Sequence, residues 1–127
     1  MERAWEDAIR RGGVGWIQEL LAAGADVNAK DRYGQTGIVL AARDDRLDVV
    51  ELLIEHGADL NVTAKYNLSA LMLAVINGHA DIARTLARAG ADLSVRGSGA
   101  PGFAGKTAYD LAVAQGLSEL GEELRPR

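Results

Sequence analysis

The tripeptide Gly-Ala-Asp occurs three times in this 127-residue chain, at residues 24–26, 57–59 and 90–92, so that both intervals are 33 residues. The residues around each copy follow one template, since LLAAGADVNAKD, LLIEHGADLNVT and LARAGADLSVRG align without a gap. Residues 32–53 align with residues 65–86 in the same register. A fixed period of this length is typical of proteins built from stacked units that contact only their neighbours. The period therefore predicts an open row of similar units.

The helical part of the template also fits both ends of the chain, at residues 3–21 and 105–124. The predicted units span about residues 1–30, 31–63, 64–96 and 97–127. The first and last units carry charged outer faces, as terminal units need for solubility, so we expect one complete domain over residues 1–127. The spacing from Thr36 to Ser69 is 33 residues, but from Ser69 to Thr107 it is 38, which predicts a five-residue insertion in the turn of the last unit.

Each unit is predicted to hold a turn and two short helices. Residues 70–75 are apolar on nearly every side, as expected of a helix enclosed by its neighbours. A second helix over about residues 47–55 places Val50, Leu53 and Ile54 inward, with its acidic residues outward. Helices this short are marginal alone in water, so burial between units must stabilise them.

The helix ends have their own signals. Thr36, Ser69 and Thr107 are the predicted N-caps, because a hydroxyl oxygen can accept from a free backbone N–H in the first turn. Glycines at the same template position, Gly24, Gly57 and Gly90, are predicted to end the second helices in the left-handed conformation.

These residues resemble the ankyrin repeat family. The resemblance lies in the period, the G-A-D-[VL]-N turns at 24–28 and 57–61, GHADIA at 78–83 and GKTAYDLA at 105–112. It implies an all-α solenoid of stacked helix-turn-helix units with short β-turn or hairpin loops. Where the family often has Thr-Pro-Leu-His, this chain has TGIV, SALM and TAYD, so that it lacks the histidine hydrogen bond and the proline helix start.

Composition narrows the class of function. The net charge of −4 disfavours nucleic acid as a partner, since nucleic-acid binding usually shows as a concentrated basic face. No segment approaches the roughly 20 apolar residues that span a bilayer, and the N-terminus lacks the apolar block of a secretory signal. We therefore expect a cytoplasmic protein without membrane contact. The absence of cysteine excludes disulfides and thiolate metal sites.

The residues GSGAPGFAGKT, 97–107, resemble a phosphate-binding loop only superficially. The P-loop pattern requires glycine five residues before Gly105, where this chain has Ala100. His56 and His79 occupy different template positions and share no metal-ligand spacing, and no serine has a glycine-flanked elbow. The sequence therefore predicts no catalysis, no metal and no cofactor.

The resemblance implies that the turn tips and the exposed ends of the first helices line a concave groove in which a partner protein binds. The positions on the turn tips are Arg32, Tyr33, Gln35, Lys65, Tyr66, Leu68, Phe103 and Lys106. The positions on the first helices are Arg10, Arg11, Arg43, Asp44, Ile76 and Asn77.

Two tyrosines stand out, because Tyr33 and Tyr66 are 33 residues apart and each follows a cation. Tyrosine and arginine are enriched at interface hot spots, although tip tyrosines can also simply pack over the next turn. The groove is basic in the first unit and more apolar around Leu68 and Ile76. This pattern suits a partner with acidic groups facing the first two units and an apolar anchor facing the third. A monomer that binds another protein is expected; the alternative is a structural or regulatory subunit that assembles through its convex helices.

The insertion has two interpretations. It can reach toward a partner, as insertions in repeat proteins often do on the binding side, or it can be a tolerated flexible loop.

Overall fold

The structure is a computed structural model that describes residues 1–99 and 101–126. Its helices are α1 (Arg3–Arg11), α2 (Val14–Ala22), α3 (Gly37–Arg43), α4 (Leu47–Glu55), α5 (Ala70–Ile76), α6 (Ala80–Arg88), α7 (Ala108–Ala114) and α8 (Ser118–Glu123). Two short antiparallel strands, β1 (Thr63–Ala64) and β2 (Leu68–Ser69), pair with Thr63 opposite Ser69 and flank the single turn η1 (Lys65–Asn67).

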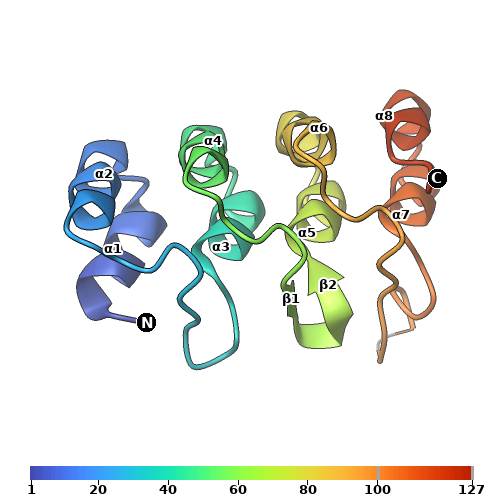
Figure 1. Ribbon diagram of the computed structural model, residues 1–127. Coiled ribbons are helices and arrows are strands. Elements are labelled where there is room, and N and C mark those ends of the chain that lie inside the picture. Colours follow the sequence, from blue (N-terminus) through green and yellow to red (C-terminus); the bar gives the residue numbers. More distant parts are fainter. Residues whose placement is uncertain (100, 127) are drawn as a thin grey trace.

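The helices form consecutive antiparallel pairs that stand side by side in one row (Figure 1). The first helices of the pairs, α1, α3, α5 and α7, make one layer, and the second helices, α2, α4, α6 and α8, make the other. The turns between units project from the first layer, at the edge of the row away from the second layer. The prediction of an all-α solenoid is confirmed.

One apolar core runs through the whole row, because every unit buries side chains against the next. Leu40 in α3, Leu71 in α5 and Leu86 in α6 are at most 1 % exposed. In α4 the prediction of the inward face is confirmed, since Val50 and Leu53 are buried and Ile54 is half-buried. Burying each such side chain contributes roughly 1.5–3 kcal/mol, so stacking between units decides the stability of these short helices.

The predicted caps differ in outcome. Ser69 accepts a hydrogen bond from the Met72 amide at 3.3 Å, and Thr107 forms a reciprocal capping box with Asp110. The prediction for Thr36 is wrong, because its buried hydroxyl has no hydrogen-bond partner although Thr36 does precede α3. Gly57 takes the predicted left-handed conformation after α4, with φ of +77°.

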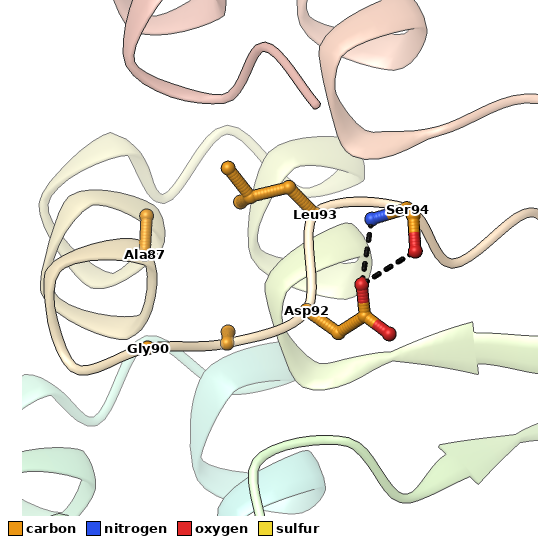
Figure 2. Close-up of a pocket in the computed structure, with 6 residues that line it drawn as sticks. Ala87, Gly90, Asp92, Leu93 and Ser94 are labelled. Carbon is orange, nitrogen blue, oxygen red and sulfur yellow. Dashed lines mark hydrogen bonds between the residues drawn. The ribbon is translucent and has the colours of Figure 1, made fainter. Parts of the chain in front are cut away.

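A ladder of side-chain hydrogen bonds ties neighbouring units together at the Gly-Ala-Asp turns. The Asn28 side-chain oxygen accepts from the Asp59 amide at 2.8 Å, and Asn61 accepts from the Asp92 amide at the same distance. Ser94 occupies the third position in this series. Its hydroxyl and its amide both donate to Asp92 within the same turn, and these two bonds hold the pKa of Asp92 below its ordinary value of 3.8 (Figure 2).

Within the described residues, none of the helices combines the length and the apolar character needed to cross a membrane.

Candidate interaction surface

The turn before α3 is built around one buried carboxylate. Oδ1 of Asp31 accepts from the amides of Tyr33 and Gln35, each at 2.9 Å, in an Asx-type turn. The side chain of Asp31 is only 4 % exposed. The turn thereby directs the Tyr33 side chain outward, where it is 63 % exposed.

The turn before α5 has alanine where the earlier turn has Asp31, so the same Asx bonds cannot form. The β1–β2 hairpin of this turn pairs Thr63 with Ser69 in the same register as the Lys30–Thr36 bridge of the earlier turn. Its tip residues Tyr66 and Asn67 adopt left-handed φ values of +63° and +56°. Such values favour glycine, and Asn67 is among the residues that tolerate them best. The Asn67 side chain also donates to the Arg96 carbonyl at 2.9 Å, which connects this tip to the following turn.

The insertion in the last turn folds back onto the hairpin. The Ser98 amide donates to the Tyr66 carbonyl at 2.7 Å, and the rings of Tyr66 and Phe103 lie 5.9 Å apart between centroids. A parallel bridge between Gly97 and Ala104 closes the insertion on itself. Its described part is therefore held by specific contacts; Ala100, within the predicted insertion, lies outside the described residues.

Both predicted tip tyrosines carry a cation over the ring. The Arg32 guanidinium carbon lies 5.0 Å from the centroid of the Tyr33 ring, and Lys65 Nζ lies 5.0 Å from that of Tyr66. Cation–π contacts of this kind contribute about 0.5–1 kcal/mol at exposed sites. They favour a position of each cation over its neighbouring ring.

The predicted residues of the first helices lie beside these tips. Arg10 pairs with Glu6 at 3.1 Å and lies 3.8 Å from Asp31, and Arg43 bonds Asp44 at 3.1 Å and the Gln35 side chain at 3.3 Å. The ends of α1 and α3 are thus connected to the turn that precedes α3.

An open hollow of about 540 Å³ lies between α1 and that turn. It is lined by Met1, Glu6, Arg10, Lys30, Asp31, Arg32 and Tyr33. Four of these residues, namely Met1, Glu6, Lys30 and Asp31, were not among the predicted site residues. The Asp-x-Tyr-Gly pattern of an Asx turn could have identified Asp31.

The remaining predicted positions have different environments. Arg11 and Asn77 are exposed, and the Asn77 side chain donates back to the Leu73 carbonyl at 2.9 Å. Ile76 is half-buried, and its carbonyl accepts from Gln115 at 3.4 Å. Lys106 is half-buried at the base of the last turn.

The prediction that Leu68 lies on the groove surface is wrong. Leu68 is only 4 % exposed, because strand β2 turns its side chain into the core. Near this turn the partly buried apolar side chains are instead Ile76 and Phe103, and the Phe103 ring contacts Tyr66.

The amides of the glycine-rich turn are engaged in internal hydrogen bonds. Gly97 donates to the Lys106 carbonyl, Gly105 to the Gly97 carbonyl and Lys106 to the Phe103 carbonyl, at 2.9 to 3.0 Å. The arrangement is that of a closed turn and differs from a phosphate-binding loop, whose amides point at the ligand.

The histidines serve in helix-end contacts. His56 Nδ1 lies 3.0 Å from the Leu52 carbonyl oxygen at the end of α4. His79 connects two units, with Nε2 at 3.1 Å from the Arg43 carbonyl oxygen and Nδ1 at 3.5 Å from Asp45.

The structure is thus a row of helix pairs joined by Gly-Ala-Asp turns, with the turn tips along one edge. The family model for ankyrin repeats, in three copies, matches residues 6–97, which is more than half of the chain. The chain belongs to the ankyrin repeat family. No curated protein matches this ankyrin-repeat chain.

Membership in the family fixes the general class of function. Ankyrin repeats are generally protein–protein interaction modules and typically carry no catalytic activity. The helix pair α7–α8 of this ankyrin-repeat protein follows the matched residues and continues the row beyond them (Figure 1).

Proposed function

We propose that this ankyrin-repeat protein binds a partner protein through the concave groove formed by its turn tips and the exposed ends of its first helices. The observation that carries the proposal is the repetition of one feature, an outward tyrosine under a cation, at Tyr33 and again at Tyr66. Rigid aromatic area with a polar handle is what interface hot spots use most.

The tips are also held in place before any partner arrives. Asp31 fixes the first tip with two backbone bonds, and the Ser98–Tyr66 bond and the Phe103 ring support the second. A preorganised surface loses less conformational entropy on binding, which raises affinity without adding contacts. These features favour the tips as the contact region, in a monomer that uses no cofactor and catalyses no reaction.

One observation favours a second candidate, assembly through the second helices, at the end of the row that α2 forms. Trp16 on α2 is 38 % exposed, whereas Val49 and Ile82, at the same template position in the next two units, are buried against their neighbours. In a structural or regulatory subunit, the Trp16 ring would contact another subunit, which can be a second copy of this chain.

A pull-down with matched variants separates the two candidates. Tyr33→Ala removes a side chain that is mostly exposed, so we expect an unchanged melting temperature and a loss of partner capture. Glu51→Ala on the convex side of α4 is the control and is expected to keep full capture.

Trp16→Ala is the variant for the second candidate. If Trp16→Ala abolishes capture while Tyr33→Ala leaves it intact, the groove proposal is rejected in favour of assembly through the second helices.

A further inference from the structure

Positive charge gathers on the turn tips of a protein that is negative as a whole. Residues 30–35, 63–68 and 96–106 contain five basic side chains and one acidic side chain. The second helices α2, α4, α6 and α8 contain eight acidic side chains and two arginines. Because these helices lie along the opposite edge of the row, the molecule has one basic and one acidic edge (Figure 1).

The tip cations are largely available to a ligand. The single acid among them, Asp31, is buried and accepts two backbone bonds. Over residues 1–99 and 101–126, no ion pair involves Lys30, Arg32, Lys65 or Lys106. An anionic group that approaches this edge therefore meets unpaired cations, which favours both its capture and its orientation.

The cations of the second and third units share a register. Arg32 and Lys65 each lie four residues before the residue that precedes the first helix of their unit, namely Thr36 and Ser69. The turn of the last unit is five residues longer, and its Phe103 ring lies against the Tyr66 ring, with 5.9 Å between the centroids. Successive units therefore present a cation, a second cation and, as the third position along the edge, a phenyl ring beside the second tip.

The distance expected between stacked helices is close to the repeat of one extended backbone conformation. Stacked helices lie about 8–10 Å apart, which sets the distance between equivalent positions of neighbouring units. A polyproline II segment has three residues per turn and rises about 3.1 Å per residue, so every third side chain faces the same way at intervals of about 9 Å. One unit of the row therefore corresponds to three residues of such a segment.

We propose that the tip edge binds an acidic segment of a partner protein in the polyproline II conformation. Its carboxylates, three residues apart, lie opposite Arg32 and Lys65, and an apolar side chain three residues further on lies opposite Phe103. Its intervening residues, proline above all, contact the parts of the Tyr33 and Tyr66 rings that remain exposed beside the cations, since aromatic-lined grooves are the usual receptors for this conformation. The inference rests on the proposed function, because it names the partner chemistry of the same surface.

A protein segment fits this edge better than a nucleic acid does. The phosphate chain of a nucleic acid carries charge at every residue and needs a continuous basic path. Here the third position along the edge is the apolar Phe103, and the acidic second helices would repel a long polyanion.

Fluorescence anisotropy with the full chain tests the proposal. The probe is labelled Glu-Pro-Pro-Glu-Pro-Pro-Leu, and the comparison peptide Glu-Glu-Pro-Pro-Pro-Pro-Leu has the same composition with adjacent carboxylates. We expect the first peptide to bind more tightly, and increasing salt to weaken it. Arg32→Gln and Lys65→Gln should each weaken binding about three- to fivefold, in line with exposed ion pairs.

Arg88→Gln removes the same charge from α6 at the acidic edge and should leave the affinity of the first peptide unchanged. The proposal is overturned if the two peptides bind with equal affinity. It is also overturned if the Arg32→Gln and Lys65→Gln variants bind the first peptide as tightly as the unsubstituted protein does. Displacement of the peptide by a single-stranded oligonucleotide that loses affinity in the same variants also overturns it and assigns the edge to nucleic acid.

The outcome is separable from the proposed function. If the peptide does not bind but Tyr33→Ala still abolishes capture of the partner protein, the groove is used and only the acidic polyproline II chemistry is rejected.

Discussion

Single side chains couple the units of this protein at defined points. Asn28 and Asn61 each satisfy a backbone amide of the next unit, whereas Ser94, at the same template position, bonds only within its own turn. The free energy of unfolding lost on substituting one of these residues should therefore be larger where the side chain is the acceptor for an amide of the next unit.

Asn61→Ala is expected to lower the free energy of unfolding by about 0.5–1.5 kcal/mol, because the Asp92 amide loses its acceptor. Ser94→Ala, which removes an exposed bond within one turn, should change it by less than about 0.5 kcal/mol. Urea denaturation monitored by circular dichroism measures both. Equal losses in the two variants would mean that the ladder does not couple the units.

The two buried threonines that precede α3 and α7 differ in whether the side-chain hydroxyl is hydrogen-bonded. Thr107→Ala removes the capping box with Asp110 and should cost about 1 kcal/mol. Thr36→Val replaces a buried hydroxyl that has no partner by a methyl group, and should be neutral or stabilising. Thermal melting of the two variants checks this, and a clear destabilisation by Thr36→Val would show that its hydroxyl has a partner after all.

At the scale of the elements, turns set where each helix ends and glycine has two distinct roles. Gly57 closes α4 with φ of +77°, and no atom lies within 4 Å of a Cβ added there. Gly15 lies inside α2 without a positive φ, and its added Cβ would likewise meet open space. The cost of substitution is therefore conformational at Gly57 and absent at Gly15.

Gly57→Ala is expected to destabilise the protein by about 1–2 kcal/mol, since a side chain disfavours the left-handed conformation. Gly15→Ala should stabilise it by about 0.5–1 kcal/mol, since alanine loses less entropy in a helix. The difference is measured by thermal or urea unfolding, and a shift of the same sign in both variants would contradict the assignment.

The last two units are joined by charge across α6 and α8. Hydrogen bonds from Arg84 and then from Arg88 hold the pKa of Glu123 below its ordinary value of 4.5. A carboxyl with a lowered folded pKa stabilises the folded state above its unfolded pKa, and this contribution disappears as the pH falls through the lower folded value. Acid unfolding below pH 4.5 should therefore be shallower in Glu123→Gln, and an identical acid profile in both proteins would contradict the link.

Periodicity predicted the regular elements well and the irregular turns poorly. The second helix expected over about residues 47–55 was found at Leu47–Glu55, since local pattern and stacking agree there. The burial of Leu68 was missed because the geometry of the hairpin decides which way that side chain points, and the repeat register alone does not specify it. The contact of Phe103 with Tyr66 joins residues far apart in the sequence, so no local sequence pattern predicts it.

In the candidate site, too, the repeat register predicted some residues, and the geometry of the turns decided the others. The tip positions of Tyr33 and Tyr66 and their preceding cations followed from the repeat register, and the structure adds the cation–π contacts. Asp31 and Lys30 were missed because one is buried in its turn and the other precedes it.

The whole molecule is an open row with its charges divided between two edges. The 33-residue repeat places an exposed cation at Arg32 and again at Lys65 in neighbouring units, which is the regular spacing that the proposed acidic segment requires. The arrangement links the 33-residue period of the sequence to the contact surface.

Site-specific photo-crosslinking tests most directly whether the tips bind the partner. A photoreactive phenylalanine analogue is placed at Tyr33 in one variant and at Glu51 on the convex side in another, and both are irradiated in lysate of the source cell. Binding through the tips yields a covalent adduct with one partner protein from position 33 and none from position 51. An adduct from position 51 alone would contradict recognition along the tip edge.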